Sequence, residues 1–222
     1  MTRISVVTPF YGPNSPALLP DYIGAVRGAE VIAVDNGSPA EAREAIRQAA
    51  ADHGWFHLIN DHNAGFAGGN TQGYKAASGD VIVFLNSDVA APPAFLRAVA
   101  ADVRDGALYG PALAHQLVYG MWVPYLEGWC VAATRATWER INAGSGPWDA
   151  EAYPGPYWED NDLCLRAAQA GISLVHTQWP VHHKGGQSAG ALIKWGDVFE
   201  RNRATFAARV RAVWESQREA AR

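Results

Sequence analysis

The sequence predicts one α/β domain in which helices flank a mostly parallel central sheet. Short β-branched runs alternate with helical patterns over the first half of the chain, and such alternation is typical of parallel sheets joined by right-handed crossovers. The length of 222 residues supports one sizeable core but is short for two full domains. Turn-forming or acidic residues follow several of the strand-like runs, and such sheets bind ligands at the carboxyl ends of their strands. We therefore expect one ligand site at that edge.

The first half of the chain carries the clearest alternation of strands and helices. The expected strands are residues 4–8, 31–34, 56–59 and 81–85. The expected helices are residues 38–53, 71–77 and 92–103. Ser38 and Glu41 have the spacing of a capping box, with Pro39 at the first helical position, which marks a helix start. Residues 9–20 are expected to form a loop.

The second half has a less regular pattern. Residues 108–156 are rich in Gly, Pro and Trp, so we expect loops and short strands there. A helix is expected to begin near Glu159 and to end at Gly171, because acids favour helix N-termini and glycine suits a left-handed cap. Residues 172–175 are expected to form a strand. Residues 197–222 place apolar side chains on one helical face with arginines around it, which predicts a docking helix or, alternatively, a membrane-surface helix.

Composition and charge exclude several classes of protein. The chain is 49% hydrophobic and carries a formal net charge of −4, so it lacks the broad basic field with which proteins bind nucleic acid. The N-terminal apolar run ends at Pro9 and is too short for a secretory signal or a spanning helix, so we expect a cytoplasmic protein. Cys130 and Cys164 lie in no CxxC pair and are expected to be reduced and buried.

Two turn segments have features of a nucleotide site. Asp35 leaves the end of an expected strand, where a carboxylate can accept hydrogen bonds from ribose hydroxyls or a base N–H. A capping aspartate in a tight turn is an equal alternative for this residue alone. The run NAGFAGGN, from Asn63 to Asn70, combines small residues that permit close backbone approach with two asparagines. It lacks the Lys-Ser/Thr pair of a Walker loop, so a simple glycine-rich connection is the alternative.

A strongly apolar strand leads into the turn Asn86-Ser87-Asp88. Mg²⁺ and Mn²⁺ prefer oxygen ligands and commonly take one or two carboxylates, with phosphate and water in the other positions. Asp88 fits that role. An ordinary surface-turn aspartate is the alternative, and we favour it less because this strand end coincides with the other candidates.

Acidic and histidine side chains gather in two later segments. Glu159, Asp160 and Asp162 stand at an expected helix start, where capping and the helix dipole explain part of the acidity, and one of them is a catalytic candidate. His182 and His183 are either exposed loop residues or part of a mixed carboxylate–histidine metal site. The pair is more informative together with the Asn-Ser-Asp turn than alone.

Taken in order, these segments resemble the inverting family 2 glycosyltransferases, particularly the bacterial rhamnosyltransferase-like members. The resemblance covers about residues 4 to 190 and rests on the run NAGFAGGN, on residues 79–89 with their Asn-Ser-Asp turn, and on EDNDLCLR from Glu159. It implies a single glycosyltransferase A-type domain with a Rossmann-like sheet. The domain would comprise a nucleotide-sugar-binding half at about 1–107, an acceptor-binding and catalytic half at about 108–196, and a C-terminal helix at 197–222.

The resemblance also implies a role for each candidate residue. Asp160 would be the general base, and Asp88 would ligate the metal with His183, or with His182 as the fallback. The nucleotide-sugar site would comprise Pro9, Asp35, Asn63, Gly65, Phe66, Asn70, Asn86 and Ser87. Glu159 would support the acceptor site. Independently of the resemblance, Trp129 and Trp158 are candidates for an acceptor platform, because such rings can pack on apolar sugar faces, although core packing is the favoured role for each. Asn86 stands where the common DxD pattern has its first aspartate, which leaves fewer charges on the metal.

The expected function is metal-dependent, inverting transfer of a sugar from a nucleoside-diphosphate sugar to a hydroxyl of a glycan or small-molecule acceptor. The attacking hydroxyl needs a carboxylate to accept its proton, and Mn²⁺ or Mg²⁺ stabilises the departing diphosphate. Sugar-phosphate nucleotidyl transfer is disfavoured because no basic glycine-rich loop lies near the first strand. A nucleotide-sugar-binding module without activity is the other alternative. The sequence predicts no transmembrane segment and leaves peripheral membrane contact and a homodimer open.

Overall fold

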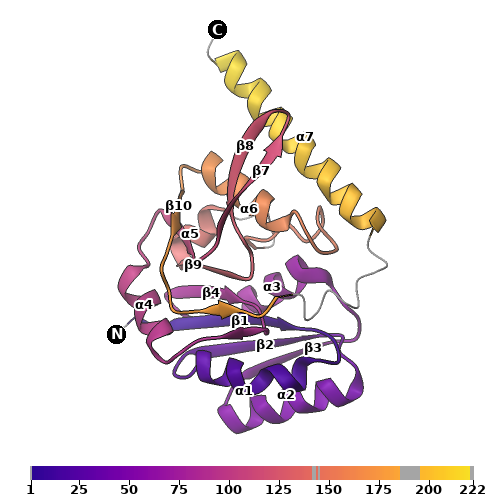
Figure 1. Ribbon diagram of the computed structural model, residues 1–222, viewed down its shortest axis with the longest axis vertical. Helices are drawn as coiled ribbons and strands as arrows, with labels where there is room; N and C mark the ends of the chain where they lie inside the picture. The colour runs from indigo at the N-terminus through magenta and orange to yellow at the C-terminus, as the bar shows by residue number, and fades with distance from the viewer. Residues whose placement is uncertain (1, 142–143, 145, 186–195, 221–222) are drawn as a thin grey trace.

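A seven-stranded sheet forms the centre of the protein, in the order β10-β6-β9-β4-β1-β2-β3 (Figure 1). The computed structural model describes residues 2–141, 144, 146–185 and 196–220. The strands of the sheet are β1 (Ile4–Phe10), β2 (Glu30–Asn36), β3 (Phe56–Asn60), β4 (Val81–Leu85), β6 (Ala107–Gly110), β9 (Cys130–Thr134) and β10 (Ser173–His176). β1 pairs in parallel with β2 and β4, β2 with β3, and β6 with β10, whereas β9 runs antiparallel to β4 and β6. The predicted mostly parallel sheet is confirmed.

Helices cover both faces of this sheet (Figure 1). One face carries α1 (Ser15–Ala25), α2 (Ala40–His53) and α4 (Ala94–Asp102), and the other carries α3 (Gly65–Ala76), α5 (Arg135–Arg140) and α6 (Glu159–Gln169). Successive residues of a strand point to opposite faces. Val6 therefore packs in the core with α1 and α2, and Val7 packs in the core with α3 and α6. The sheet is buried on both sides, as the near-continuous apolar runs predict.

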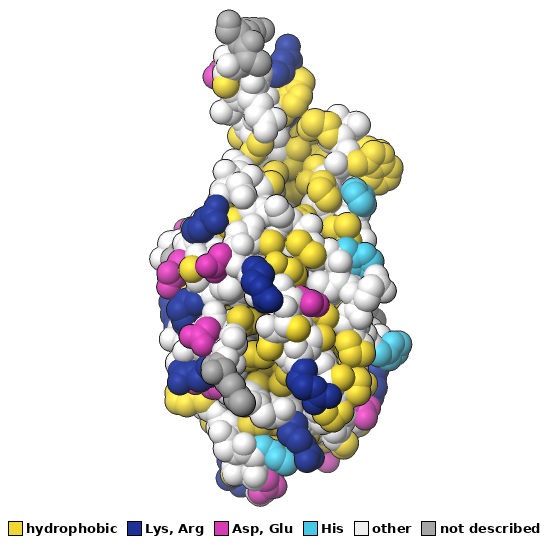
Figure 2. Space-filling model, turned by 90° about the vertical axis from the view of Figure 1, so that its left-hand side faces the viewer, with side chains coloured by type: hydrophobic (Ala, Val, Ile, Leu, Met, Phe, Trp, Pro, Cys, Tyr) yellow, Lys and Arg dark blue, Asp and Glu magenta, His cyan; other side chains and the backbone are white. Residues whose placement is uncertain are grey.

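A hairpin and the last helix extend the molecule beyond the sheet. β7 (Leu113–Val118) pairs antiparallel with β8 (Met121–Leu126), and α7 (Gly196–Ala220) runs beside them (Figure 1). Phe206 and Val210 of α7 pack in a separate cluster of buried residues, as expected of a docking helix. Figure 2 shows this end as a narrow projection on which hydrophobic side chains gather. Over the described residues, none of the helices has the length and apolar content needed to cross a membrane.

Several local expectations are confirmed. The strand at 81–85 has the predicted bounds, the helix from Glu159 ends before Gly171, and Gly171 has the left-handed φ of +66° that a glycine cap requires. Cys130 and Cys164 are both buried and free. Residues 186–195 and 221–222 lie outside the described part of the chain, so the corresponding parts of the predicted catalytic half and C-terminal helix do too.

Three segments in which no helix is expected contain one. A loop is expected over residues 9–20, but residues 15–25 form α1. The prolines in this segment suggest a loop. One of them, however, occupies the first helical turn, where proline is tolerated. α3 begins at Gly65 rather than at Thr71, so the glycine-rich run is the start of a helix. Its glycines allow close packing on β1: a Cβ at Gly73 would lie 2.3 Å from Cγ1 of Val7. α5 likewise interrupts the region expected to hold loops and short strands.

Candidate active site

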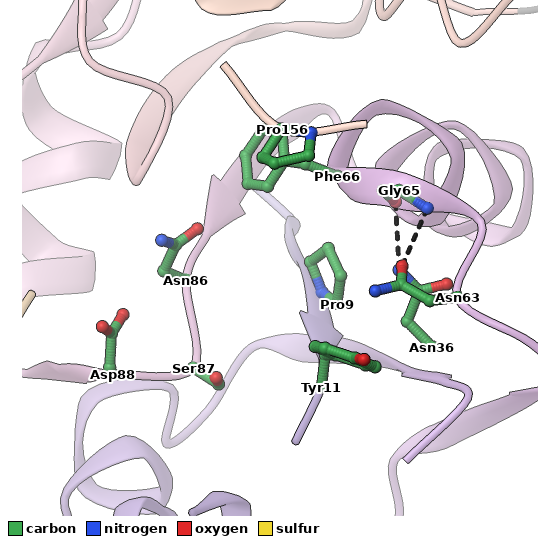
Figure 3. Close-up of a pocket in the computed structure, with 10 residues that line it drawn as sticks. All are labelled: Pro9, Tyr11, Asn36, Asn63, Gly65, Phe66, Asn86, Ser87, Asp88 and Pro156. Carbon is green, nitrogen blue, oxygen red and sulfur yellow. Dashed lines mark hydrogen bonds between the residues drawn. The ribbon is translucent and has the colours of Figure 1, made fainter. Parts of the chain in front are cut away.

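The carboxyl ends of β1, β2 and β4 surround a cavity, at the edge of the sheet where a ligand site is expected (Figure 3). Most of its lining residues are candidates chosen from the sequence. The lining residues are Pro9, Tyr11, Asn36, Asn63, Gly65, Phe66, Asn86, Ser87, Asp88 and Pro156. Figure 3 shows Phe66 and Pro156 next to each other, across the cavity from Tyr11. Residues far apart in the chain therefore meet at one site.

Sequence reasoning misses three lining residues, namely Tyr11, Asn36 and Pro156. The first two carry a usable signal, because β1 and β2 each run two residues further than predicted and the missed side chains lie at or just beyond those strand ends. Pro156 belongs to the irregular segment before α6, and nothing in its local pattern indicates that this segment returns to the cavity.

Two asparagine side chains hold the loop that precedes α3. Asn36 Nδ2 donates to Asn63 Oδ1 and to the Gly65 carbonyl, each at 3.0 Å, and its Oδ1 accepts the Ala64 N–H. Asn63 Oδ1 also accepts the Gly65 N–H at 2.8 Å. Gly65 has a φ of +76°, and a Cβ there would lie 2.5 Å from the Pro154 carbonyl oxygen, so only glycine fits. The loop thus connects the end of β2 with the segment before α6.

Asp35 and Asn70 do not line the cavity. The fully buried Asp35 carboxylate accepts the Ser38 N–H at 2.8 Å and pairs with Arg43 Nε at 2.8 Å. These are the contacts of an aspartate that caps a tight turn, and the adjacent Asn36 faces the cavity instead. Asn70 is also buried, and its Nδ2 donates to a backbone carbonyl one helical turn earlier. Direct contact of either side chain with a nucleotide stays a prediction.

Asp88 and His183 form the charged part of the site. Asp88 immediately precedes β5 (Val89–Ala90), which pairs antiparallel with β11 (His182–His183). This pairing brings His183 Nε2 to 3.0 Å from Asp88 Oδ1, whereas His182 is exposed. Of the two histidines, His183 is therefore the neighbour of Asp88.

The Asp88–His183 pair has the donor chemistry of a divalent-metal site. Mn²⁺ accepts both carboxylate oxygen and imidazole nitrogen, and cis ligands of an octahedral ion with bonds of about 2.1 Å lie about 3 Å apart. Within residues 2–141, 144, 146–185 and 196–220, no three His, Cys, Asp or Glu side chains form a group that could hold a metal. The pair therefore supplies one carboxylate and one imidazole donor, and a metal held here would need further ligands from outside these side chains.

Residues 127–129, between β8 and β9, connect this pair with Asp160. The Trp129 ring stacks on His183, with centroids 4.8 Å apart and an interplanar angle of 10°. The Trp129 carbonyl accepts the Asn86 N–H at 2.8 Å. Trp129, a predicted acceptor residue, thus lies against the candidate metal ligand and the end of β4.

Asp160 is half-buried in the first turn of α6. Its Oδ2 accepts the Gly128 N–H at 3.1 Å, and its Oδ1 accepts the Asn161 N–H at 2.8 Å. A Cβ at Gly128 would lie 3.3 Å from both Asp160 Cβ and the ring of Phe66, so Gly128 lies between Asp160 and a residue that lines the cavity, whereas Asp160 itself is not among the lining residues. Burial raises the pKa of Asp160 to about 6, against the lowering effect of the two hydrogen bonds. Burial and the charge of Asp160 raise the pKa of Glu159, which is nearly inaccessible.

Trp158 lies outside the cavity. Both Tyr157 and Trp158 have a φ of 75°, in the left-handed region that aromatic residues rarely adopt. The Trp158 ring packs against Phe199 and Phe206 of α7, with centroid separations of 5.7 and 5.6 Å. Core packing accounts for these contacts, and a contact of Trp158 with an acceptor stays a prediction.

Solved glycosyltransferase structures share this fold. Glucosyl-3-phosphoglycerate synthase from Mycobacterium tuberculosis, in complex with Mn²⁺, UDP and phosphoglyceric acid, matches with a TM-score of 0.64 over 94% of this chain and 78% of that chain, at 18% identity. The mannosyltransferase PcManGT from Pyrobaculum calidifontis, in complex with GDP-Man and Mn²⁺, matches with a TM-score of 0.60 over 79% of this chain and 55% of that chain, at 17% identity. The fold is the glycosyltransferase A fold.

The chain belongs to glycosyl transferase family 2, because the model of that family matches residues 5–143, more than half of the sequence. A curated relative is undecaprenyl-phosphate 4-deoxy-4-formamido-L-arabinose transferase from Aeromonas hydrophila, which is 34% identical over 100 residues. That match spans 40% of this chain and only 30% of the relative. The family and the fold expected from the sequence are confirmed.

Proposed function

We propose that this protein is a metal-dependent, inverting glycosyltransferase that moves a sugar from a nucleoside-diphosphate sugar to a hydroxyl of a glycan or small-molecule acceptor. The observation that carries the proposal is the convergence of three parts of the chain on one cavity. Asp88, Asn36 and Asn63 line it, and His183 lies 3.0 Å from Asp88. Asp160 is not a lining residue, but residues 127–129 connect it with His183 through the Gly128–Asp160 hydrogen bond and the Trp129–His183 stacking.

The cavity offers suitable groups for a nucleotide sugar. Tyr11 presents an aromatic ring on which a base can stack, and the asparagines supply amide groups that can bind ribose or base edges. The Asn86 side chain and the Ser87 backbone lie beside Asp88, where the diphosphate would bind to a metal held by that carboxylate. The role of each lining residue in donor binding is part of the proposal.

Asp88 and His183 would hold Mn²⁺ or Mg²⁺, which supplies Lewis-acid stabilisation of the charge that develops on the leaving diphosphate. One protein carboxylate rather than two leaves the ion more positive, because Asn86 is neutral. The mannosyltransferase and the synthase to which this fold is similar were both solved with Mn²⁺, which supports a divalent ion at this position.

Asp160 would act as the general base. A carboxylate with a pKa of about 6 is ionised at neutral pH and is a stronger base than an ordinary aspartate. Its hydrogen bonds to two backbone N–H groups fix its orientation while each oxygen keeps a lone pair for the acceptor hydroxyl. Attack by that hydroxyl on the face opposite the leaving diphosphate inverts the anomeric centre in a single displacement.

The acceptor is proposed by class only. The name of the Aeromonas relative includes a lipid-linked phosphate, which supports testing polyprenyl phosphate and lipid-linked glycans beside soluble sugars, and a role in polysaccharide biosynthesis. The exposed Trp122 on the hairpin and the arginines of α7 allow peripheral contact with a membrane carrying such an acceptor.

The test is release of nucleoside diphosphate from a panel of sugar nucleotides with Mn²⁺, with and without chelator, in the presence of each acceptor class. Chelator is expected to abolish release, and product analysis by NMR is expected to show an inverted anomeric centre. Binding of donors without transfer or hydrolysis would favour a non-catalytic binding module. Pyrophosphate release from a nucleoside triphosphate would favour nucleotidyl transfer.

A further inference from the structure

The last helix contacts the segment that leads into α6. Asn202 of α7 is completely buried, and its Nδ2 lies 3.1 Å from the Tyr157 carbonyl oxygen, 3.3 Å from that of Pro156 and 3.5 Å from that of Gly155. A side-chain amide carries two N–H groups, so the shortest contacts satisfy them both. One side chain thus binds the backbone of residues 155–157.

This segment needs an external donor because its conformation is unusual. Tyr157 and Trp158 both have a φ of 75°, and two consecutive left-handed residues with large side chains persist only where the surroundings fix them. A left-handed turn directs successive carbonyls away from regular helix or strand partners. Asn202 supplies hydrogen bonds to those carbonyls, and Phe206, one helical turn later, packs on the Trp158 ring.

The same segment borders both halves of the proposed site. Pro156 lines the cavity, and Gly65, the first residue of α3, packs against the Pro154 carbonyl. At its other end, Trp158 is followed directly by Glu159 and Asp160. A shift of residues 155–158 would therefore move the wall of the donor cavity and the proposed base together.

We infer that Asn202 is a positioning residue that holds residues 155–158 in the conformation that aligns Asp160 with the bound donor. This inference rests on the proposed function, because it assigns Asn202 a task within that site. α7 lies beyond the part of the chain that the family model matches. Its packing is braced by Arg209, which forms ion pairs with Asp149 and with Asp162 of α6. The helix is therefore held firmly enough to act as a support.

Sequence periodicity carries a signal for this residue. Asn202 is three residues after Phe199 and four before Phe206, so it stands on the apolar face of the helix. A polar side chain on that face, fully buried, has to be hydrogen-bonded or to leave its polar atoms unsatisfied. In the structure its Nδ2 is hydrogen-bonded to the backbone of this segment, whereas its Oδ1 has no hydrogen-bond partner among the described residues.

The experiment compares Asn202→Leu, which removes the donor at similar size, with Val210→Ala. Val210 is buried in the same cluster on α7 and takes no part in these hydrogen bonds, so its variant measures loss of α7 packing alone. Urea unfolding provides the stability of each variant. We expect Asn202→Leu to lower kcat at least about 10-fold, since misplacement of a catalytic group by about 1 Å can cost 10²-fold. Val210→Ala is expected to change kcat less than about 2-fold.

Two further measurements separate positioning from stability. The acid limb of the kcat/KM profile, which reports the ionisation of Asp160, is expected to move to higher pH in Asn202→Leu and not in Val210→Ala, because a displaced carboxylate loses backbone N–H partners. The affinity for nucleoside diphosphate with Mn²⁺, measured by calorimetry, is expected to fall in Asn202→Leu only. Asn202→Ser, which keeps one O–H donor, is expected to give intermediate values and serves if Asn202→Leu does not fold.

Equal effects of Asn202→Leu and Val210→Ala on kcat, on the pH profile and on nucleotide affinity would overturn the inference, even if the wild-type protein is an active transferase. If the wild-type protein transfers no sugar from any donor, the proposed function fails instead. In that case nucleotide affinity alone still decides whether Asn202 supports the cavity.

Discussion

Replacing Asp160 with asparagine is expected to lower activity and to make the variant more stable relative to the wild type at pH 8 than at about pH 4.5. In the proposed reaction the Asp160 carboxylate accepts the proton of the attacking hydroxyl, and an amide cannot do so. A general base contributes about 10²–10⁴-fold, so kcat is expected to fall by that factor. This corresponds to about 3–5 kcal/mol in the barrier, at about 1.4 kcal/mol for each tenfold change. The asparagine Oδ1 can still accept a backbone N–H, so the KM for the donor is expected to change less than about 3-fold.

The pH dependence of this difference in stability follows from the raised pKa of Asp160. Folded Asp160 has a pKa of about 6, above the ordinary value of 3.8. Between these values the folded state binds more protons than the unfolded state, so the free energy of unfolding falls as the pH rises through this window. At pH 8 the ionised carboxylate costs up to about 3 kcal/mol, and at about pH 4.5 it costs about 1 kcal/mol. Asparagine does not titrate, so the difference in unfolding free energy between variant and wild type is expected to favour the variant by about 2 kcal/mol more at pH 8 than at about pH 4.5. At both pH values asparagine loses one of the two backbone hydrogen bonds, because its amide nitrogen cannot accept an N–H.

Urea unfolding of both proteins at the two pH values measures this difference, and initial rates of nucleotide release measure kcat. Asp61→Asn, which removes an exposed aspartate from the turn after β3, is the control for a change in net charge. A kcat within about 10-fold of the wild type would refute the assignment of Asp160 as the base. Equal differences in unfolding free energy between variant and wild type at the two pH values would refute the raised pKa.

The remaining predictions concern the Asp88–His183 pair and Gly65. Asp88→Asn is expected to raise the Mn²⁺ concentration for half-maximal activity at least about 10-fold, because it removes the one carboxylate of the pair, whereas His182→Ala is expected to leave it unchanged since that side chain is exposed. An unaltered Mn²⁺ titration for Asp88→Asn would place the ion elsewhere. Gly65→Ala is expected to lower the free energy of unfolding by at least about 2 kcal/mol and to weaken donor binding, because a Cβ there meets the Pro154 carbonyl at 2.5 Å in a left-handed residue. Gly24→Ala, in a helix with open space around the added Cβ, is the control and is expected to be neutral or stabilising in urea.

The fold and the frame of the site could be predicted because they depend on local pattern. β4 is apolar in all of its residues, so its bounds and the polar turn that follows it are visible in the sequence. The carboxyl end of such a strand is where an α/β sheet binds ligands, which made Asp88 a strong candidate. The three acids at the start of the later helix likewise indicated one catalytic residue among them, and the family resemblance, not the local pattern, selected Asp160.

What could not be predicted depends on pairing between distant segments. The family resemblance favours His183 over His182, but the residues alone leave the choice open, because it depends on the register of β11 with β5, and a shift of one residue would exchange their faces. Asp35 and Asn36 show the same limit. Both leave the end of β2, but only the structure shows that Arg43 and the Ser38 N–H bind the carboxylate while the amide faces the cavity.

The three residues between β8 and β9 contact both the proposed base and the proposed metal ligand. Gly128 donates its N–H to Asp160, while the next residue, Trp129, stacks on His183 and accepts the Asn86 N–H. A Cβ at Gly128 would be 3.3 Å from Asp160 and from Phe66, a spacing that forces neighbours to yield. Because adjacent residues of one strand connection contact both groups, a displacement of either group would be transmitted to the other. The proposed base and the proposed metal ligand are therefore both in contact with two consecutive residues of one strand connection.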